Sequence, residues 1–127
     1  APMRILLADD TPENRLLIEV YLKKTAHHLE TAENGEIALA LFKKRTCDLV
    51  LMDMQMPVMD GYTATREIRK WEQAHGVKPT PIVALTAEAM VEDEQRSAAA
   101  GCTDHVVKPI RKAKLMEIIA RYAPKAL

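Results

Sequence analysis

Short apolar runs and amphipathic stretches alternate five times along this chain, and this alternation limits the possible fold more than any other feature of the sequence. Apolar runs of five or six residues are typical of strands in parallel sheets, where both faces are buried. Stretches with apolar residues three and four positions apart are typical of helices with one buried face. We expect strands at Met3–Ala8, Leu29–Glu33, Asp48–Asp53, Pro81–Thr86 and His105–Val107.

A helix signal follows each of these runs. Thr11-Pro12-Glu13 places a capping residue before a proline, as at many helix starts. The expected helices cover residues 11 to about 26, a stretch after Asn34-Gly35, about 62–76, 87–100 and a last stretch with Leu115, Ile118, Ile119 and Tyr122 on one face. The residues expected to face inward in the first two helices are Leu17, Val20 and Tyr21, and then Ile37, Ala38, Leu41 and Phe42.

Repeated strand–helix units at this spacing predict an α/β fold, a doubly wound five-stranded parallel sheet with helices on both faces and right-handed crossovers. A chain of 127 residues is long enough to bury one core, so we expect a single domain over residues 1–127. Ligands of such sheets bind outside the carboxyl ends of the strands, at a switch point in the strand order.

The composition excludes several classes of partner. Lys plus Arg equals Asp plus Glu, with 18 of each, so nothing favours nucleic acid or an anionic membrane as a partner of this domain. There is no signal peptide and no run long enough to span a bilayer, so we expect a cytoplasmic location. Cys47 and Cys102 lack metal-type spacing and are expected to be free thiols. The start at Ala1-Pro2, without methionine, is compatible with a piece of a longer protein.

Charged residues close three of the apolar runs. Asp53 ends one run, Asp9 and Asp10 follow the first, and Lys108 follows the last. A carboxylate at the end of a buried strand is costly unless a metal, a proton or a cation attends it. Because parallel strands present their carboxyl ends at one edge of the sheet, we expect three carboxylates and one ammonium to meet there.

Carboxylates gathered in one cleft repel each other unless a hard cation is bound. Mg²⁺ suits this arrangement because it accepts a few oxygen ligands and keeps several waters; Mn²⁺ is the alternative ion. We expect Asp10 and Asp53 to be direct ligands, Asp9 to act directly or through water, and the backbone carbonyl of Gln55 to add a third protein oxygen.

With its charge offset by the cation, Asp53 can attack phosphorus and become an aspartyl phosphate. The transferring group carries negative charge, which we expect Lys108, the Thr86 hydroxyl and the Ala87 amide to stabilise. Plainer interpretations also exist. Asp10 could cap a helix together with Glu13, Thr86 could be a helix cap, and Lys108 could be a solvated lysine.

The motifs in this order resemble the response-regulator receiver domain of two-component signalling over nearly the whole chain. The segments that carry the resemblance are Asp9-Asp10, 52–61 around Asp53, 84–87 and 107–109. It implies the flavodoxin-like receiver fold with strand order 2-1-3-4-5. It also implies Asp53 as acceptor of phosphate from phosphohistidine, a Mg²⁺ site at Asp9, Asp10 and the Gln55 carbonyl, and Thr86 and Lys108 as the pair that contacts the phosphoryl group. The Lys108–Pro109 bond is cis in relatives.

Relatives often carry Tyr or Phe three residues before the lysine, and that ring moves inward with the threonine on activation. Here His105 stands at this position, so we expect a switch of Thr86 and His105 that differs from the usual aromatic one. Residues 81–87 and 101–105 look most like receivers of hybrid sensor histidine kinases. This implies a histidine kinase or histidine phosphotransfer protein as partner, and a parent kinase that is membrane-bound with this domain on its cytoplasmic side.

Several other functions compete with this one. A stand-alone regulator that binds a downstream target protein is the nearest alternative, and a receiver that binds proteins without phosphate is another. A haloacid-dehalogenase-type phosphohydrolase needs a second aspartate two residues after the nucleophile, where Gln55 stands. A flavodoxin-like cofactor binder needs a hydroxyl- and glycine-rich loop in place of Asp9-Asp10. We therefore expect no turnover enzyme, only self-phosphorylation and autodephosphorylation.

Overall fold

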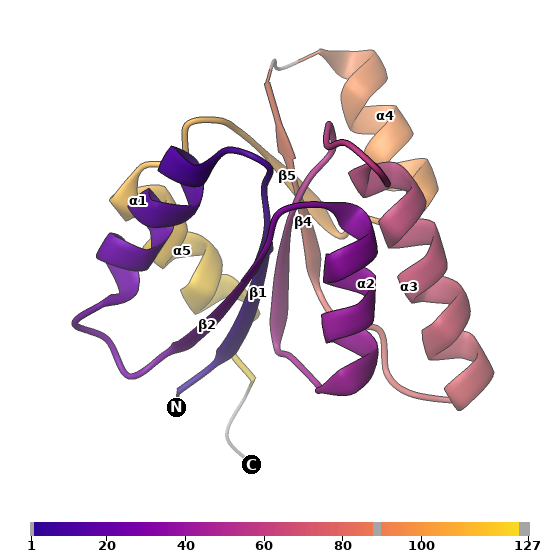
Figure 1. Cartoon of the computed structure of the whole chain (residues 1–127), viewed down its shortest axis with the longest axis horizontal. Coiled ribbons are helices and arrows are strands. Elements are labelled where there is room, and N and C mark those ends of the chain that lie inside the picture. Colours follow the sequence, from indigo (N-terminus) through magenta and orange to yellow (C-terminus); the bar gives the residue numbers. More distant parts are fainter. Residues whose placement is uncertain (1, 88–89, 125–127) are drawn as a thin grey trace.

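Five parallel strands in the order β2-β1-β3-β4-β5 form the centre of the structure, a computed structural model that describes residues 2–87 and 90–124 (Figure 1). This is the order that the resemblance implied. The elements along the chain are β1 Arg4–Ala8, α1 Pro12–Leu22, β2 His28–Ala32, α2 Gly35–Lys44, β3 Leu49–Asp53, α3 Gly61–His75, β4 Ile82–Thr86, α4 Val91–Ala100, β5 Asp104–Val107 and α5 Lys112–Tyr122. Each strand lies within one residue of its predicted bounds.

The register of the sheet sets where the strands end. Ala8 pairs with Met52, so Asp9 leaves β1 beside the last residue of β3. On the other side of β3, Asp53 pairs with Leu85, and Thr86 at the end of β4 pairs with Val107. The carboxyl ends of these four strands therefore share one edge, as the alternating pattern predicted.

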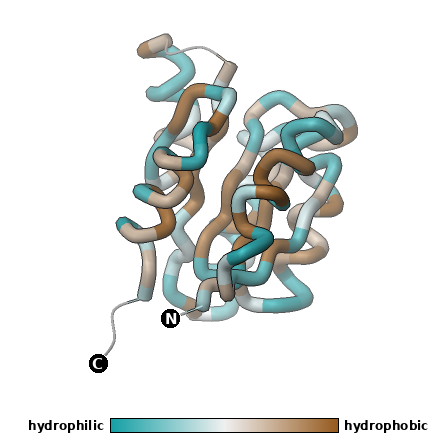
Figure 2. Tube along the Cα trace, turned by 90° about the vertical axis from the view of Figure 1, so that its left-hand side faces the viewer, coloured by the Kyte–Doolittle hydropathy of each residue, from teal (hydrophilic) through white to brown (hydrophobic). Residues whose placement is uncertain are grey.

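Helices cover both faces of the sheet. Alternate strand side chains point to opposite faces. On one face, β1, β3 and β4 pack against Ile18 and Leu22 of α1 and Leu115, Ile118 and Ile119 of α5. On the other face, the sheet packs against Phe42 of α2, Ile68 of α3 and Ala100 of α4. Along the helices the hydropathy alternates between teal and brown, as expected for helices with one buried face (Figure 2).

The first helix differs from its prediction in length and in facing. It ends at Leu22 and not near residue 26, because the Thr25 hydroxyl and amide both donate to the Leu22 carbonyl and close the chain into a turn. Val20 was expected to face inward but is 58% exposed, and Ile18 and Leu22 are buried in its place. The expected inward facing of Ile37 in α2 was also wrong, since its side chain is exposed.

The fourth helix begins later than predicted. It starts at Val91 and not at Ala87, and Met90, in an extended conformation, is its N-cap; residues 88 and 89 lie outside the described residues. Glu92, Asp93 and Glu94 occupy its first turn, where their charge suits the positive end of the helix dipole. The other predicted helix ends hold, with Gly76 and Gly101 as left-handed C-caps of α3 and α4.

Two composition-based expectations concern thiols and membranes. Cys47 and Cys102 are both free, as predicted. Among the described residues, every helix is too short or too polar to cross a lipid bilayer.

Candidate functional site

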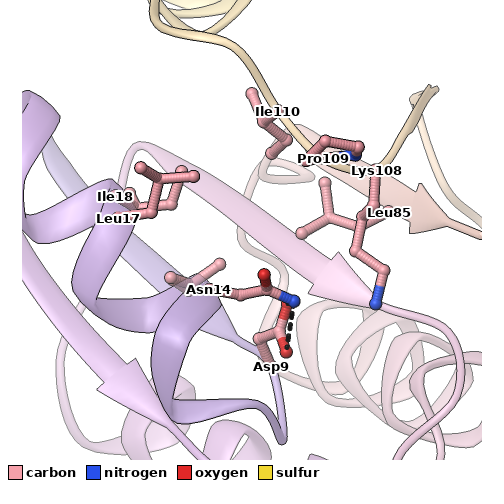
Figure 3. A pocket seen from close by; sticks show the side chains of 9 residues that line it. Asp9, Asn14, Leu17, Ile18, Leu85, Lys108, Pro109 and Ile110 are labelled. Carbon is pink, nitrogen blue, oxygen red and sulfur yellow. Dashed lines mark hydrogen bonds between the residues drawn. The ribbon is translucent and has the colours of Figure 1, made fainter.

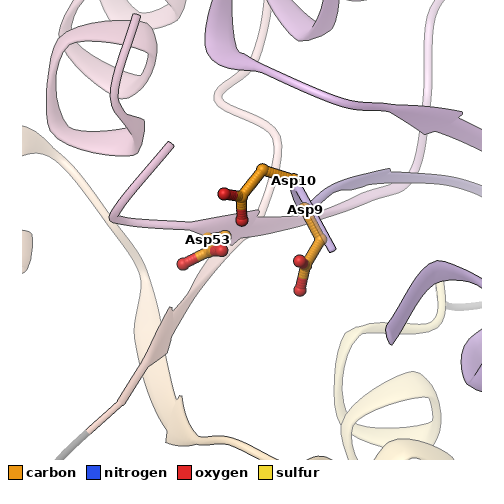
Figure 4. Close-up of side chains that lie close together, drawn as sticks. All are labelled: Asp9, Asp10 and Asp53. Atoms are coloured by element: carbon orange, nitrogen blue, oxygen red, sulfur yellow. The ribbon is translucent and has the colours of Figure 1, made fainter. Parts of the chain in front are cut away.

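Three carboxylates meet at the carboxyl edge of the sheet. One oxygen atom from each of Asp9, Asp10 and Asp53 lies within 4.8 Å of the other two (Figure 4). Asp9 and Asp53 are each 1% exposed, whereas Asp10 is exposed to solvent. Two strand ends and the turn after β1 therefore bring together the acidic residues that the sequence predicted.

Asp53 is held on both of its oxygens. Lys108 Nζ lies 3.0 Å from Oδ2, and the Gln55 backbone amide donates to Oδ1 over 3.2 Å. Burial raises the pKa of the Asp53 carboxyl, and the nearby Asp9 carboxylate raises it further, while Lys108 and the Gln55 amide act in the opposite direction. Lys108 thus keeps an ionised carboxylate in a place where burial disfavours the charge.

The backbone around Lys108 places its side chain across the sheet edge. The Lys108 amide donates to the Thr86 carbonyl over 2.7 Å, which fixes the end of β5 against the end of β4. The Lys108–Pro109 peptide bond is cis, as the resemblance implied. In Figure 3 the lysine side chain extends toward the edge where Asp9 lies. The solvated-lysine interpretation is therefore wrong, because this ammonium pairs with the buried Asp53.

A cavity of about 260 Å³ opens over Asp53. Gln55, Thr86, Ala87 and Lys108 line it, so four further predicted site residues surround the carboxylate. Thr86 is 5% exposed, and its hydroxyl donates to the Val106 carbonyl over 3.5 Å, a long bond. Because a water molecule occupies about 30 Å³ in the liquid, the cavity has room for a phosphoryl group and several waters. Thr86 is not a helix cap, since α4 begins at Val91.

The loop between β3 and α3 lies close against the strand end. A Cβ atom at Gly61 would stand 2.2 Å from the Asp53 carbonyl oxygen, so only glycine fits there. Asp60 caps α3 by accepting a hydrogen bond from the Thr63 amide over 2.8 Å. Val58 has a positive φ of 69°, which is rare for a β-branched residue. The loop thus lies close against the backbone of Asp53.

The predicted switch residue His105 points toward α4. Its Nε2 lies 2.9 Å from the Glu94 carboxylate, and its side chain is 38% exposed. It is therefore half-buried and not packed beside Thr86 in this structure. The capping interpretation of Asp10 is also wrong, because the N-cap of α1 is Thr11.

Sequence reasoning missed residues that support or line the site. Asn14 and Arg15, in the first turn of α1, donate hydrogen bonds to Asp9. Tyr62 and Asp93 line the cavity over Asp53. The position of Asn14 was the available signal, since it lies six residues after the end of β1 and two after Pro12, in the first turn of the following helix.

The donor set at this edge fits a hard divalent cation. Three carboxylates face one ammonium, Lys108, so the cluster carries excess negative charge. Oxygen ligands of this type suit Mg²⁺, which binds one or two carboxylates and retains waters for contact with a phosphoryl group.

Comparisons with known proteins agree with this geometry. Residues 5–120 match the response regulator receiver domain family. The chain is 39% identical over 124 residues to the sensor histidine kinase GacS of Pseudomonas protegens, a match that covers 98% of this chain and 14% of that protein. The chain therefore spans about one seventh of the length of this relative.

Solved structures give the same result. The receiver domain of sensor histidine kinase PA1611 from Pseudomonas aeruginosa PAO1, which has a magnesium ion in its active site cleft, is 38% identical with a TM-score of 0.83, covering 96% of this chain and 98% of that one. The Saccharomyces cerevisiae Ssk1 receiver domain, crystallised with the histidine phosphotransfer protein Ypd1, is 29% identical with a TM-score of 0.92, covering 95% and 88%. The chain belongs to the response regulator receiver domain family of two-component phosphorelays.

Proposed function

We propose that Asp53 accepts a phosphoryl group from a phosphohistidine of a partner protein, with Mg²⁺ bound at the adjacent carboxylates. The observation that carries this proposal is the buried Asp53 carboxylate, paired with Lys108 at 3.0 Å and set among two further carboxylates below an open cavity. A buried acid paired in this way is available as a nucleophile, because the lysine keeps it ionised.

In the transfer step, an Asp53 carboxylate oxygen attacks phosphorus, a P–O bond forms and the P–N bond to the donor imidazole breaks. The leaving imidazole takes up a proton from solvent. Lys108, the Thr86 hydroxyl and the Ala87 amide line the same cavity and supply a positive charge and donors for the phosphoryl oxygens. The family signature and the geometry together support these roles.

Asp10, Asp53 and the Gln55 carbonyl would hold the Mg²⁺ ion, with Asp9 beside them. When bound there, the ion would offset the charge of the carboxylates and supply positive charge for the phosphoryl oxygens. Mn²⁺ has similar ligand preferences and should replace Mg²⁺ in the same assay.

The partner that fits this domain best is a histidine phosphotransfer protein. The Ssk1 receiver, whose fold is nearly the same, was crystallised with such a protein, and GacS is a sensor histidine kinase. We place the chain as one receiver domain, residues 1–127, in a hybrid sensor kinase and on the cytoplasmic side. Phosphorylation then shifts a two-state equilibrium in which Thr86 turns toward the phosphoryl group and His105 leaves Glu94.

An intact-mass assay with acetyl phosphate tests the proposal. The wild type should gain one phosphoryl group only with Mg²⁺ or Mn²⁺, and Asp53→Ala should gain none. Asp48→Ala is the matched control, because Asp48 lies at the opposite end of the same strand, where it accepts a hydrogen bond from the Arg4 amide. A phosphoryl adduct that persists in Asp53→Ala, or that forms in a chelator, would contradict the assignment.

A second arm tests the partner. Incubation with a phosphorylated histidine phosphotransfer protein should move the phosphoryl group to the wild type within the same assay. Transfer from acetyl phosphate without transfer from any phosphohistidine donor would leave Asp53 as acceptor and overturn the proposed partner class.

A further inference from the structure

Asp9 is the carboxylate that the first turn of α1 holds. The Thr11 amide donates to its Oδ1 over 2.9 Å. Asn14 Nδ2 lies 3.4 Å from Oδ1 and 3.3 Å from Oδ2 (Figure 3). Arg15 Nη1 donates to the Asp9 carbonyl over 2.7 Å. The backbone of Asp9 is thus fixed by an arginine, while its carboxylate is held by the Thr11 amide and, over longer contacts, by the Asn14 side chain.

Asparagine is an informative choice at this position. Its side chain competes with backbone hydrogen bonds, so it is a weak helix former inside a helix. Here the amide turns to Asp9, where it offers two donors and no charge. A lysine would bring a second ammonium that competes with a bound cation, and an acidic residue would add repulsion. Asn14 therefore holds Asp9 without changing the charge of the carboxylate cluster.

The surroundings of this contact are largely apolar. Asp9 and Asn14 share a cavity of about 20 Å³, room for one water, whose wall includes Leu17, Ile18 and Ile110. A hydrogen bond at such a place meets little competition from solvent, so the Asn14 amide restrains Asp9 more than it would on an open surface.

As a result, the three carboxylates differ in how firmly hydrogen bonds hold them in place. Asp53 is held by Lys108 and Gln55, and Asp9 by Thr11 and Asn14, whereas the Asp10 side chain has no hydrogen bond to any residue that the structure describes. Two fixed carboxylates and one adaptable one suit an ion that needs few protein ligands. Mg²⁺ requires near-octahedral geometry and keeps waters, while Ca²⁺ takes six to eight oxygens in flexible geometry.

We propose that Asn14 is a positioning residue of the metal site, which raises the affinity for Mg²⁺ and maintains the preference for Mg²⁺ over Ca²⁺ by holding Asp9 in place. This inference rests on the proposed function, since it takes Asp9, Asp10 and Asp53 as the site of the ion. Once Asn14 is removed, only the Thr11 amide still holds the Asp9 carboxylate, whose second oxygen can then turn toward a larger ion as an additional ligand.

Isothermal titration of Mg²⁺ and, separately, of Ca²⁺ tests this inference on wild type, Asn14→Ala and Asn14→Gln. The alanine variant should lose about tenfold in Mg²⁺ affinity, the low end of the effect of such supporting residues, and less in Ca²⁺ affinity. The glutamine variant keeps an amide donor and should recover part of the loss. Asn34→Ala is the matched control, because Asn34 uses its side chain to cap α2 by accepting from the Ile37 amide.

The control should lower the melting temperature and leave both affinities unchanged. An unchanged ratio of Mg²⁺ to Ca²⁺ affinity in a folded Asn14→Ala protein would overturn the inference, whether both affinities stay the same or fall equally. If the alanine variant does not fold, the glutamine and serine variants at the same position carry the test. Failure of the wild type to bind Mg²⁺ would refute the proposed function itself, whereas binding that Asp10→Asn abolishes and Asn14→Ala leaves intact would refute only this inference.

Discussion

At the scale of single residues, the site contains a buried carboxylate, Asp53, whose ionised form is disfavoured by burial. Burial raises the pKa of the Asp53 carboxyl, and Asp9 adds to this effect, although Lys108 offsets part of it. A carboxyl whose pKa is higher in the folded protein binds its proton more tightly there than in the unfolded chain. The free energy of unfolding should therefore fall as the pH rises from about 3.9, the ordinary aspartate value, through the raised value of Asp53.

We expect Asp53→Asn to be more stable than the wild type at neutral pH without Mg²⁺, because it removes a charge that burial disfavours. The difference should shrink as the pH falls and vanish well below about 3.9, the ordinary aspartate pKa, where Asp53 is protonated in both states. Urea unfolding of both proteins, at neutral pH and at acidic pH, measures this difference in the free energy of unfolding. Asp60→Ala serves as control and should lose about 1 kcal/mol, since Asp60 caps α3. A less stable Asp53→Asn protein at neutral pH would contradict the argument.

The sequence predicted some of these residues and not others, for a physical reason. Asp9, Asp10, Asp53 and Lys108 each follow an apolar run, so the parallel sheet alone brings them to one edge. Asn14 lies on a helix, and its direction depends on how α1 is rotated about its axis. That rotation follows from packing against the sheet, which the predicted facing of the helix did not capture.

At the scale of elements, the loop between β3 and α3 contains backbone strain. Val58 lies in the left-handed region with φ of 69°, and its side chain is 75% exposed. A β-branched side chain in this conformation crowds its own backbone, which costs roughly 1–2 kcal/mol. In addition, the Met59 amide donates to the Pro57 carbonyl across Val58, which is the pattern of a tight three-residue turn.

We expect Val58→Gly to stabilise the protein by about 0.5–1 kcal/mol, because glycine adopts this conformation freely but loses more entropy on folding. Gly76→Ala is the converse control, since it adds a side chain at a residue with positive φ instead of removing one. Gly76 has φ of 62° with nothing within 4 Å of an added Cβ, so the substitution tests backbone strain alone and should destabilise. Thermal melting of both variants measures the effect, and equal melting temperatures for Val58→Gly and wild type would contradict it.

The fourth helix is the least anchored element on its face of the sheet. Of its side chains, only Ser97 and Ala100 are buried, and both are small. Its further contacts are polar, with the Arg96 guanidinium 3.9 Å from the centre of the Tyr62 ring and Glu94 paired with His105 at 2.9 Å. Few buried apolar contacts mean a low free energy of local opening.

Hydrogen–deuterium exchange should therefore show amides of α4 exchanging faster than those of α3 and α5. Arg96→Ala should speed exchange in α4 further, because it removes the contact with Tyr62. Arg66→Ala is the control, since Arg66 contacts Thr63 within its own helix. Protection of α4 equal to that of α3 would show that these polar contacts hold the helix as firmly as a buried apolar face.

Element ends were harder to predict than elements. The pattern of apolar residues continues past Leu22, but the Thr25 side chain binds the Leu22 carbonyl and ends α1. Likewise, the Ala- and Glu-rich segment after β4 has good helix formers throughout, yet α4 starts only at Val91. At the end of α1 a local hydrogen bond decides the boundary, and the apolar period does not report it.

At the scale of the whole molecule, the Lys108 side chain links the ends of two strands that are not neighbours in the sheet. Periodicity predicts five parallel strands but cannot order them, and the order came from the family resemblance. In that order β3 and β5 are not neighbours, and β4 separates them. Lys108, at the end of β5, reaches past β4 to Asp53 at the end of β3. A change at Asp53 therefore has a direct route to β5.

This connection gives a prediction about coupling. In Lys108→Ala, the carboxylates lose their ammonium partner, so Mg²⁺ should bind at least as tightly as in the wild type. Phosphorylation should then no longer alter β5 and α4, because the phosphoryl group has lost the side chain that links it to them. Amide NMR shifts of residues 91–107, measured with Mg²⁺ before and after acetyl phosphate, should change in the wild type and stay constant in the variant.

Lys112→Ala is the control for this experiment, since Lys112 is an exposed residue at the start of α5, and it should behave like the wild type. The variant must first be shown to carry phosphate by intact mass, so that lost coupling is separated from lost phosphorylation. Shifts of wild-type size in a phosphorylated Lys108→Ala protein would mean that Thr86, whose carbonyl accepts the Lys108 amide, transmits the change through the backbone alone. Shifts that disappear only in Lys108→Ala assign the coupling to the ammonium group that Asp53 holds in the resting state.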